Sequence, residues 1–133
     1  MKSSGYCFLL MIAFLSLQQC SIEKYPDGKR FYENNCENCH FPDGQGFREL
    51  NPPLAQSDFL IQNRNALPCI ILNGLDGPIQ VNGITYDHPM PGSPHLHDAE
   101  ITNIINYINS AWGNDQPYMT LQEVSEALAS CRK

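Results

Sequence analysis

The sequence has few basic residues, and they are scattered. Lysine and arginine together number 8, against 14 aspartates and glutamates, and the formal net charge is −6. Proteins that bind nucleic acids neutralise phosphates with clustered Lys and Arg side chains. The composition therefore argues against a nucleic-acid partner, and the acidic balance favours solubility and a basic docking partner.

Long apolar runs are also lacking, apart from residues 6–17, which follow a short basic start at Met1 and Lys2. A helix that spans a membrane needs about 18 or more apolar residues. This run is too short for that role, and its position and order are typical of a secretory signal.

The run ends in Leu17-Gln18-Gln19-Cys20-Ser21, which resembles a bacterial lipoprotein signal, with leucine three residues before an acylated cysteine and Gln19 where a small residue is usual. We expect residues 1–19 to be removed and Cys20 to carry lipid. The protein would then be exported to the periplasmic side and anchored to a membrane by its acyl chains. The alternative is ordinary cleavage that releases a soluble protein. Either route leads to an oxidising compartment, where disulfides persist.

The chain has one Cys-x-x-Cys pair, in Cys36-Glu37-Asn38-Cys39-His40, which is the pattern of covalent haem attachment. Two thiols on one helical turn can add to two vinyl groups, and the next histidine can bind iron. A redox dithiol would need a Val/Ile-rich strand ahead of Cys36, and none is there. A zinc site would need a second cysteine pair, although His88, His95 and His97 keep that alternative open.

Turn residues and apolar spacing predict four or five helices, long loops and one small hairpin. Helices are expected from Pro26 into the haem motif and over residues 58–63, 66–72, 98–112 and 120–130. Asn82-Gly83 between residues 79–81 and 84–86 predicts the hairpin. The predicted core residues are Ile71, Leu72, Ile101, Ile104 and Ile105. Loops this long suit a small domain only if they wrap something, and a buried haem supplies apolar area that the core lacks.

Residues around the motif resemble a class I cytochrome c over about residues 26–112. The matching residues are Gly28 and Tyr32 on the first helix, Tyr107 on the last, Pro52-Pro53-Leu54 and Met90-Pro91. The resemblance implies an all-α class I cytochrome c fold of four to five helices around one covalently bound haem c, with a small β-hairpin before the methionine loop.

The same resemblance implies the roles of the site residues. Cys36 and Cys39 would hold haem through thioether bonds, and His40 and Met90 would be the axial iron ligands. The carbonyl of Pro53 would accept the proton of His40, and Leu54 would lie against the porphyrin. His88 is the alternative sixth ligand.

Three further residues are candidates to contact the haem propionates. They are Arg48, Tyr86 and Trp112. The alternatives are a solvated loop charge for Arg48 and helix-end packing for Trp112.

The implied function is one-electron transfer without catalysis. The stretches 71–74, 77–79, 82–83 and 107–114 resemble a bacterial subgroup whose members partner dehydrogenases or terminal oxidases, some of them as complex subunits. The alternatives are a catalytic or gas-sensing haem with a displaceable methionine and, more remotely, the zinc or dithiol module.

These assignments divide the chain into a signal (1–19), a tether (20–25), a cytochrome c domain (26–114) and a C-terminal helical extension (115–133). Cys7 leaves with the signal, and lipid and haem account for three further cysteines, so Cys69 and Cys131 remain. We predict a disulfide between these two, the alternative being two buried or free thiols.

Overall fold

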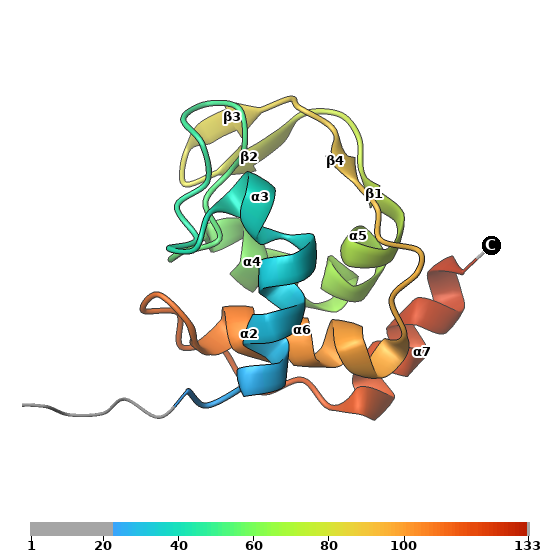
Figure 1. The fold of residues 1–133 in the computed structure, drawn as a ribbon. Coiled ribbons are helices and arrows are strands. Elements are labelled where there is room, and N and C mark those ends of the chain that lie inside the picture. The colour runs from blue at the N-terminus through green and yellow to red at the C-terminus, as the bar shows by residue number, and fades with distance from the viewer. Residues whose placement is uncertain (1–22, 133) are drawn as a thin grey trace, which may run out of the picture.

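The computed structural model describes residues 23–132, so the predicted signal and Cys20 lie outside the described residues. This part contains six α-helices, one 3-10 turn and two short antiparallel sheets (Figure 1). In chain order the elements are α2 (Pro26–Asn35), α3 (Glu37–His40), α4 (Asp58–Gln62), η1 (Arg64–Ala66), α5 (Leu67–Asn73), β1 (Gly74–Leu75), β2 (Ile79–Val81), β3 (Ile84–Tyr86), β4 (Met90–Pro91), α6 (Asp98–Ser110) and α7 (Leu121–Cys131).

The predicted mostly helical fold is confirmed, with six helices instead of four or five. The additional one arises because the expected first helix breaks at Cys36, whose φ of −124° lies outside the helical range, and resumes as the single turn α3. The helix expected to reach Trp112 ends at Ser110, since Ala111 is extended and Trp112 has a positive φ of 53°.

Helices α2 and α6 cross in close contact (Figure 1). Gly28 makes this approach possible, because a Cβ there would lie 2.8 Å from Tyr107 Cβ and would also meet the Asn103 carbonyl. Beside the crossing, the rings of Tyr32 and Tyr107 pack with their centroids 5.4 Å apart. The glycine and the two tyrosines that match the family therefore form the contact between α2 and α6.

The core forms where α6 meets the helices around it. All five residues predicted as core from their spacing are buried: Ile71, Leu72, Ile101, Ile104 and Ile105. On α6, the intervals of three and four residues place its isoleucines on one stripe, which is the pattern that buries one face of a helix.

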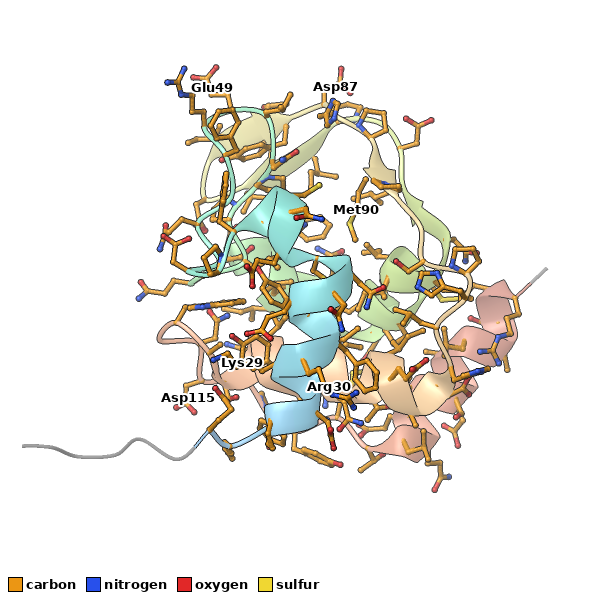
Figure 2. All side chains as sticks on the ribbon, in the orientation of Figure 1. Lys29, Arg30, Glu49, Asp87, Met90 and Asp115 are labelled. Carbon is orange, nitrogen blue, oxygen red and sulfur yellow. A yellow bond between two sulfur atoms is a disulfide. The ribbon has the colours of Figure 1, made fainter. Side chains whose placement is uncertain are left out.

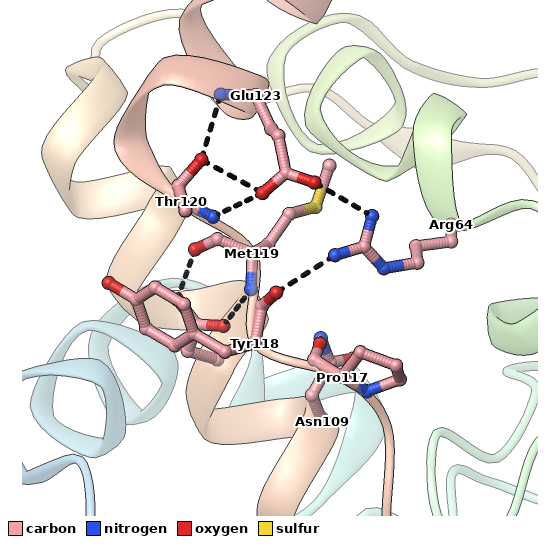
Figure 3. A network of polar contacts seen from close by, with 8 residues as sticks. Arg64, Asn109, Pro117, Tyr118, Met119, Thr120 and Glu123 are labelled. Carbon is pink, nitrogen blue, oxygen red and sulfur yellow. Dashed lines mark hydrogen bonds and ion pairs between the residues drawn. The ribbon is translucent and has the colours of Figure 1, made fainter.

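The C-terminal extension packs against α5 and α6. Cys69 and Cys131 form a disulfide with their Cα atoms 6.0 Å apart. Before α7, Met119 is buried and its backbone N–H and carbonyl bond to the Asn106 amide at 2.8 Å each. Arg64 bridges from η1 to the Tyr118 carbonyl and to Glu123, which also completes a capping box with Thr120 (Figure 3).

Two small sheets complete the fold. The predicted hairpin is present, and β2 pairs with β3 through a turn in which Asn82 and Gly83 have φ values of 51° and 80°. The second sheet was not predicted: β1 pairs with β4, with Leu75 opposite Met90. At the start of α4, Ser57 makes no side-chain cap; Asn82 Oδ1 instead accepts the Asp58 N–H at 3.1 Å.

Between residues 23 and 132, none of the helices combines the length and apolar character that a membrane span requires.

Replacing Gly28 with alanine is expected to lower the free energy of unfolding by about 1–3 kcal/mol, because the added methyl pushes α2 away from the α6 backbone. Denaturant titration of the purified protein measures the change. Asn34→Ala, an exposed change on the same helix, is the control and should cost no more than about 0.5 kcal/mol. Equal stability of the two variants would contradict the close crossing.

Acid should weaken the docking of α7 on α6 through Asp98. Bonds from Ser125 and then Arg132 lower the pKa of the Asp98 carboxyl. A carboxyl with a lowered folded-state pKa stabilises above its unfolded value, near 3.9, and that stability is lost as the pH falls through the folded value. Asp98→Asn should therefore lower stability at pH 7 and flatten its decline below about pH 4, as measured by denaturant unfolding across pH. An unchanged pH profile would contradict this role.

Candidate functional site

A cavity of about 290 Å³ opens between α3, α5, α6 and the strands β2–β4. Most of its wall is apolar, with contributions that include Leu60, Leu67, Ile70, Ile71, Ile104 and Ile108. Cys36, Cys39 and His40 reach it from α3, and Met90 reaches it from β4. The structure thus brings the four principal predicted site residues to one cavity, although Met90 lies 50 positions after His40 in the sequence.

The two cysteines lie on one turn, as the spacing predicted, and neither is in a disulfide. Cys36 is half-buried, and burial, followed by the charge of Cys39, raises the pKa of its thiol to about 12. A thiol with so high a pKa carries almost no thiolate at neutral pH, whereas redox dithiols depend on a lowered pKa. The redox-dithiol alternative therefore finds no support in this site.

His40 is buried, with 7% of its surface exposed, and its Nδ1 lies 3.0 Å from the Pro52 carbonyl oxygen. A carbonyl only accepts hydrogen bonds, so Nδ1 carries the proton and Nε2 keeps a lone pair for a metal. Burial lowers the pKa of His40, while the bond to Pro52 opposes that shift. The ring is thus kept neutral, the form in which imidazole binds iron.

The predicted acceptor, the carbonyl of Pro53, is wrong by one residue. After Pro53 the chain turns toward Gly44, whose carbonyl accepts the N–H groups of Leu54 and Ala55 at 2.7 and 2.9 Å. This turn leaves the Pro52 carbonyl facing the imidazole. Gly46 permits the approach, because a Cβ there would lie 2.6 Å from the Pro52 oxygen. Pro53 and Leu54 still line the cavity.

The exit of the chain from α3 is strained and supported by a tyrosine. Phe41 has a φ of 60°, which is uncommon for a bulky residue. The Tyr32 hydroxyl donates to the Phe41 carbonyl at 2.6 Å. Asn51 Nδ2 donates to the Cys39 carbonyl at 3.1 Å and ties the 41–53 loop to the same turn. These bonds fix the direction in which His40 enters the cavity.

Met90 lies on the side of the cavity away from α3, half-buried on β4 (Figure 2). Glu49 and Asp87, labelled in the same view, project from the top edge of the molecule. His88 is exposed and also borders the cavity, so it remains the alternative ligand. Gly74 and Gly92 let the strand lie directly on the end of α5, since a Cβ on Gly74 would be 2.7 Å from the Gly92 nitrogen.

The three candidates for contact with the haem propionates lie in different surroundings. Tyr86 is buried and lines the cavity. Trp112 lies outside the cavity wall, donates its indole N–H to the Pro42 carbonyl at 2.9 Å and packs on Tyr32, so its role is helix-end packing. Arg48 is exposed, with its guanidinium 5.5 Å from the centre of the Phe47 ring.

Sequence reasoning missed several polar contacts of the site. Ser57 is 3% exposed and lines the cavity, and Asn35 Oδ1 accepts from His95 Nε2 at 3.0 Å. Nothing in the residue pattern signals such long-range side-chain contacts. His97 begins α6 through its backbone N–H, which donates to Glu100 at 2.8 Å.

The donor set fits a covalently held haem. Two thiols, a neutral imidazole and a thioether sulfur face a cavity with largely apolar walls. A zinc site instead needs a cluster of charged or imidazole ligands, and no group of three His, Cys, Asp or Glu side chains in residues 23–132 could hold a metal ion.

Comparison with known proteins agrees with this chemistry. The family model described as cytochrome c matches residues 25–112. Cytochrome c-552 of Thermus thermophilus is 35% identical over 108 residues, covering 78% of this chain and 72% of the relative. The cytochrome c subunit of the quinone alcohol dehydrogenase of Gluconobacter oxydans is 31% identical over 93 residues, or 68% of this chain and 19% of the subunit.

A third relative is the cytochrome subunit of a fructose dehydrogenase from Gluconobacter japonicus. It is 31% identical over 113 residues, and this chain spans 23% of its length. The dehydrogenase subunits are thus several times longer than the segment they share with this chain.

The protein belongs to the cytochrome c family. It is a class I mono-haem cytochrome c, an electron-transfer protein whose cofactor is haem c.

Proposed function

We propose that this protein is an exported one-electron carrier whose single haem is held by Cys36 and Cys39 and ligated by His40 and Met90. The observation that carries the proposal is the convergence of these four side chains, from α3 and β4, on one apolar cavity. When bound, haem supplies an iron that takes up and releases one electron.

Attachment uses the two thiols of α3. Cys36 and Cys39 would hold the haem through two thioether bonds, which addition of each S–H across a vinyl group would form without a leaving group or an oxidant. The raised pKa of Cys36 keeps that thiol protonated. Its position at the break between α2 and α3, one turn from Cys39, lets both sulfurs face the cavity.

The axial roles follow from what each side chain offers. His40 presents Nε2 because Nδ1 is committed to Pro52. Met90 offers a neutral, soft sulfur, which favours the ferrous state more than a second imidazole would. His40 and Met90 would together leave no coordination position open to a substrate, and the apolar walls would exclude water from the metal. The second candidate function is a catalytic or gas-sensing haem, in which a ligand displaces Met90 from the iron.

The partner is expected to be a redox protein, either a dehydrogenase or a terminal oxidase. Two relatives are cytochrome subunits of dehydrogenases by name, one of them a quinone alcohol dehydrogenase. The net charge of −6 favours a basic docking face on such a partner.

The N-terminus supports export and anchoring. Residues 1–19 would be removed, residues 20–25 would form a tether, and lipid on Cys20 would hold the cytochrome domain (26–114) and its extension (115–133) at the periplasmic side of a membrane.

Replacing Met90 with alanine should abolish the weak sulfur-to-iron absorption at the red end of the visible spectrum. It should also lower the reduction potential, because loss of the soft thioether removes stabilisation of the ferrous state. Optical spectra and redox titration of the purified protein measure both. An unchanged spectrum would contradict ligation by Met90, and loss of the same band in His88→Ala would assign that role to His88.

Carbon monoxide added to the reduced protein distinguishes an electron carrier from a catalytic or gas-sensing haem protein. Slow or negligible binding at neutral pH by the unmodified protein, with fast binding by Met90→Ala, supports a carrier with two filled axial positions. Rapid binding by the unmodified protein would favour the second candidate.

Cys20→Ala should abolish incorporation of labelled fatty acid into the protein by cells expressing it, because Cys20 would carry the acyl chains. The optical spectrum of the haem should stay unchanged. Absence of the label from the unmodified protein would show that the signal is of the ordinary, non-lipidated type.

A further inference from the structure

We infer that the C-terminal extension is a brace for the sixth-ligand strand, acting on Met90 through α5 and the Cys69–Cys131 disulfide. The inference rests on the proposed ligation by Met90. It assigns a positioning role to residues that do not themselves line the cavity.

The strand that carries Met90 lies in contact with α5. β4 pairs with β1, which follows α5 directly, and Leu75 lies opposite Met90. Ser93 N–H donates to the Ile71 carbonyl at 2.9 Å. A Cβ on Gly92 would lie 2.6 Å from the Leu72 carbonyl oxygen. The strand therefore lies against the last turn of α5 without room for a side chain between them, so a shift of α5 shifts Met90.

Helix α5 is too short to be stable without contacts to other elements. It has 7 residues and no side-chain cap at its N-terminus. Isolated helices of that length are unstable, and their position depends on tertiary contacts. One face of α5 lines the cavity with Leu67, Ile70 and Ile71, so only its other contacts can hold it in place.

Helix α7 packs on α5 in addition to the contacts that α6 makes with it. The disulfide joins Cys69 in the middle of α5 to Cys131 at the end of α7. Asn73 Nδ2, at the end of α5, donates to the Cys131 carbonyl at 3.2 Å. In Figure 1, α7 runs beside α5 on the side away from the haem motif. The last turn of α7 is thus tied to α5 at two points.

Helix α7 is also fixed to α6, through contacts that do not involve α5. Asp98, at the start of α6, accepts from Ser125 at 2.7 Å and pairs with Arg132. Asn106 on α6 holds both backbone polar groups of Met119. Because α6 crosses α2 at Gly28, the brace connects the ligand strand to the close crossing of these two helices.

The test is amide hydrogen exchange in the intact haem-loaded protein, comparing the Ser93 amide, bonded to Ile71, with the Ala55 amide, bonded to Gly44 across the cavity. In the double variant Cys69→Ser with Cys131→Ser, Ser93 should exchange more than about tenfold faster while Ala55 changes by less than about twofold. The methionine–iron absorption should also be lost at a lower temperature.

Gln122→Ala is the matched control, because exposed Gln122 bonds only Glu126 on α7 itself and its loss leaves the contacts of α7 with α5 and α6 in place. It should leave the ratio of Ser93 to Ala55 exchange unchanged. If the double variant fails to fold, Asn73→Ala removes one tie with the disulfide intact and should raise Ser93 exchange in the same direction by a smaller factor.

Equal acceleration of both amides would overturn the inference, since it would show general destabilisation, and so would unchanged Ser93 exchange. If the unmodified protein lacks methionine–iron absorption, the proposed ligation by Met90 fails, while the contrast between the two amides still decides whether the brace holds the strand.

Discussion

The hydrogen bond from His40 Nδ1 to the Pro52 carbonyl is the contact on which the rest of the site depends. It selects the tautomer that leaves Nε2 available, and it holds the 41–53 loop against α3. Asn51 and Tyr32 support the same turn from either side, through the carbonyls of Cys39 and Phe41. Together these bonds hold the Pro- and Gly-rich loop 41–53 in place as one wall of the cavity.

Opposite that wall the protein uses a different means of placement. Met90 sits on a two-residue strand, which has little stability by itself. Its position comes from α5 beneath it and, by our inference, from α7 beyond. One side of the cavity is therefore fixed by local hydrogen bonds within a single loop, and the other by a covalent tie between segments 62 residues apart in the sequence.

What the sequence predicted well was local and periodic. The isoleucine spacing of α6 and the Asn82-Gly83 turn each express a short-range physical preference, and each feature is present. The Cys-x-x-Cys-His pattern is local too, which is why Cys36, Cys39 and His40 could be assigned to one site from their spacing.

What it missed was non-local or undetermined by residue type. The β1–β4 pair is too short to show an alternating pattern, and the break at Cys36 has no glycine or proline to signal it. Pro52 and Pro53 are identical residues, so only the turn toward Gly44 decides which carbonyl meets His40. Met90 was assigned by family resemblance, because no property of the residue itself places it opposite His40.

The most direct test of this account is the intact mass of the mature protein after unfolding in acid. Bonds from Cys36 and Cys39 to the cofactor predict a mass larger than that of the mature polypeptide, with its N-terminal modification included, by one haem. That addition should disappear when both cysteines are replaced by serine. A mature chain that carries no haem, or that loses it on denaturation, would contradict the covalent site.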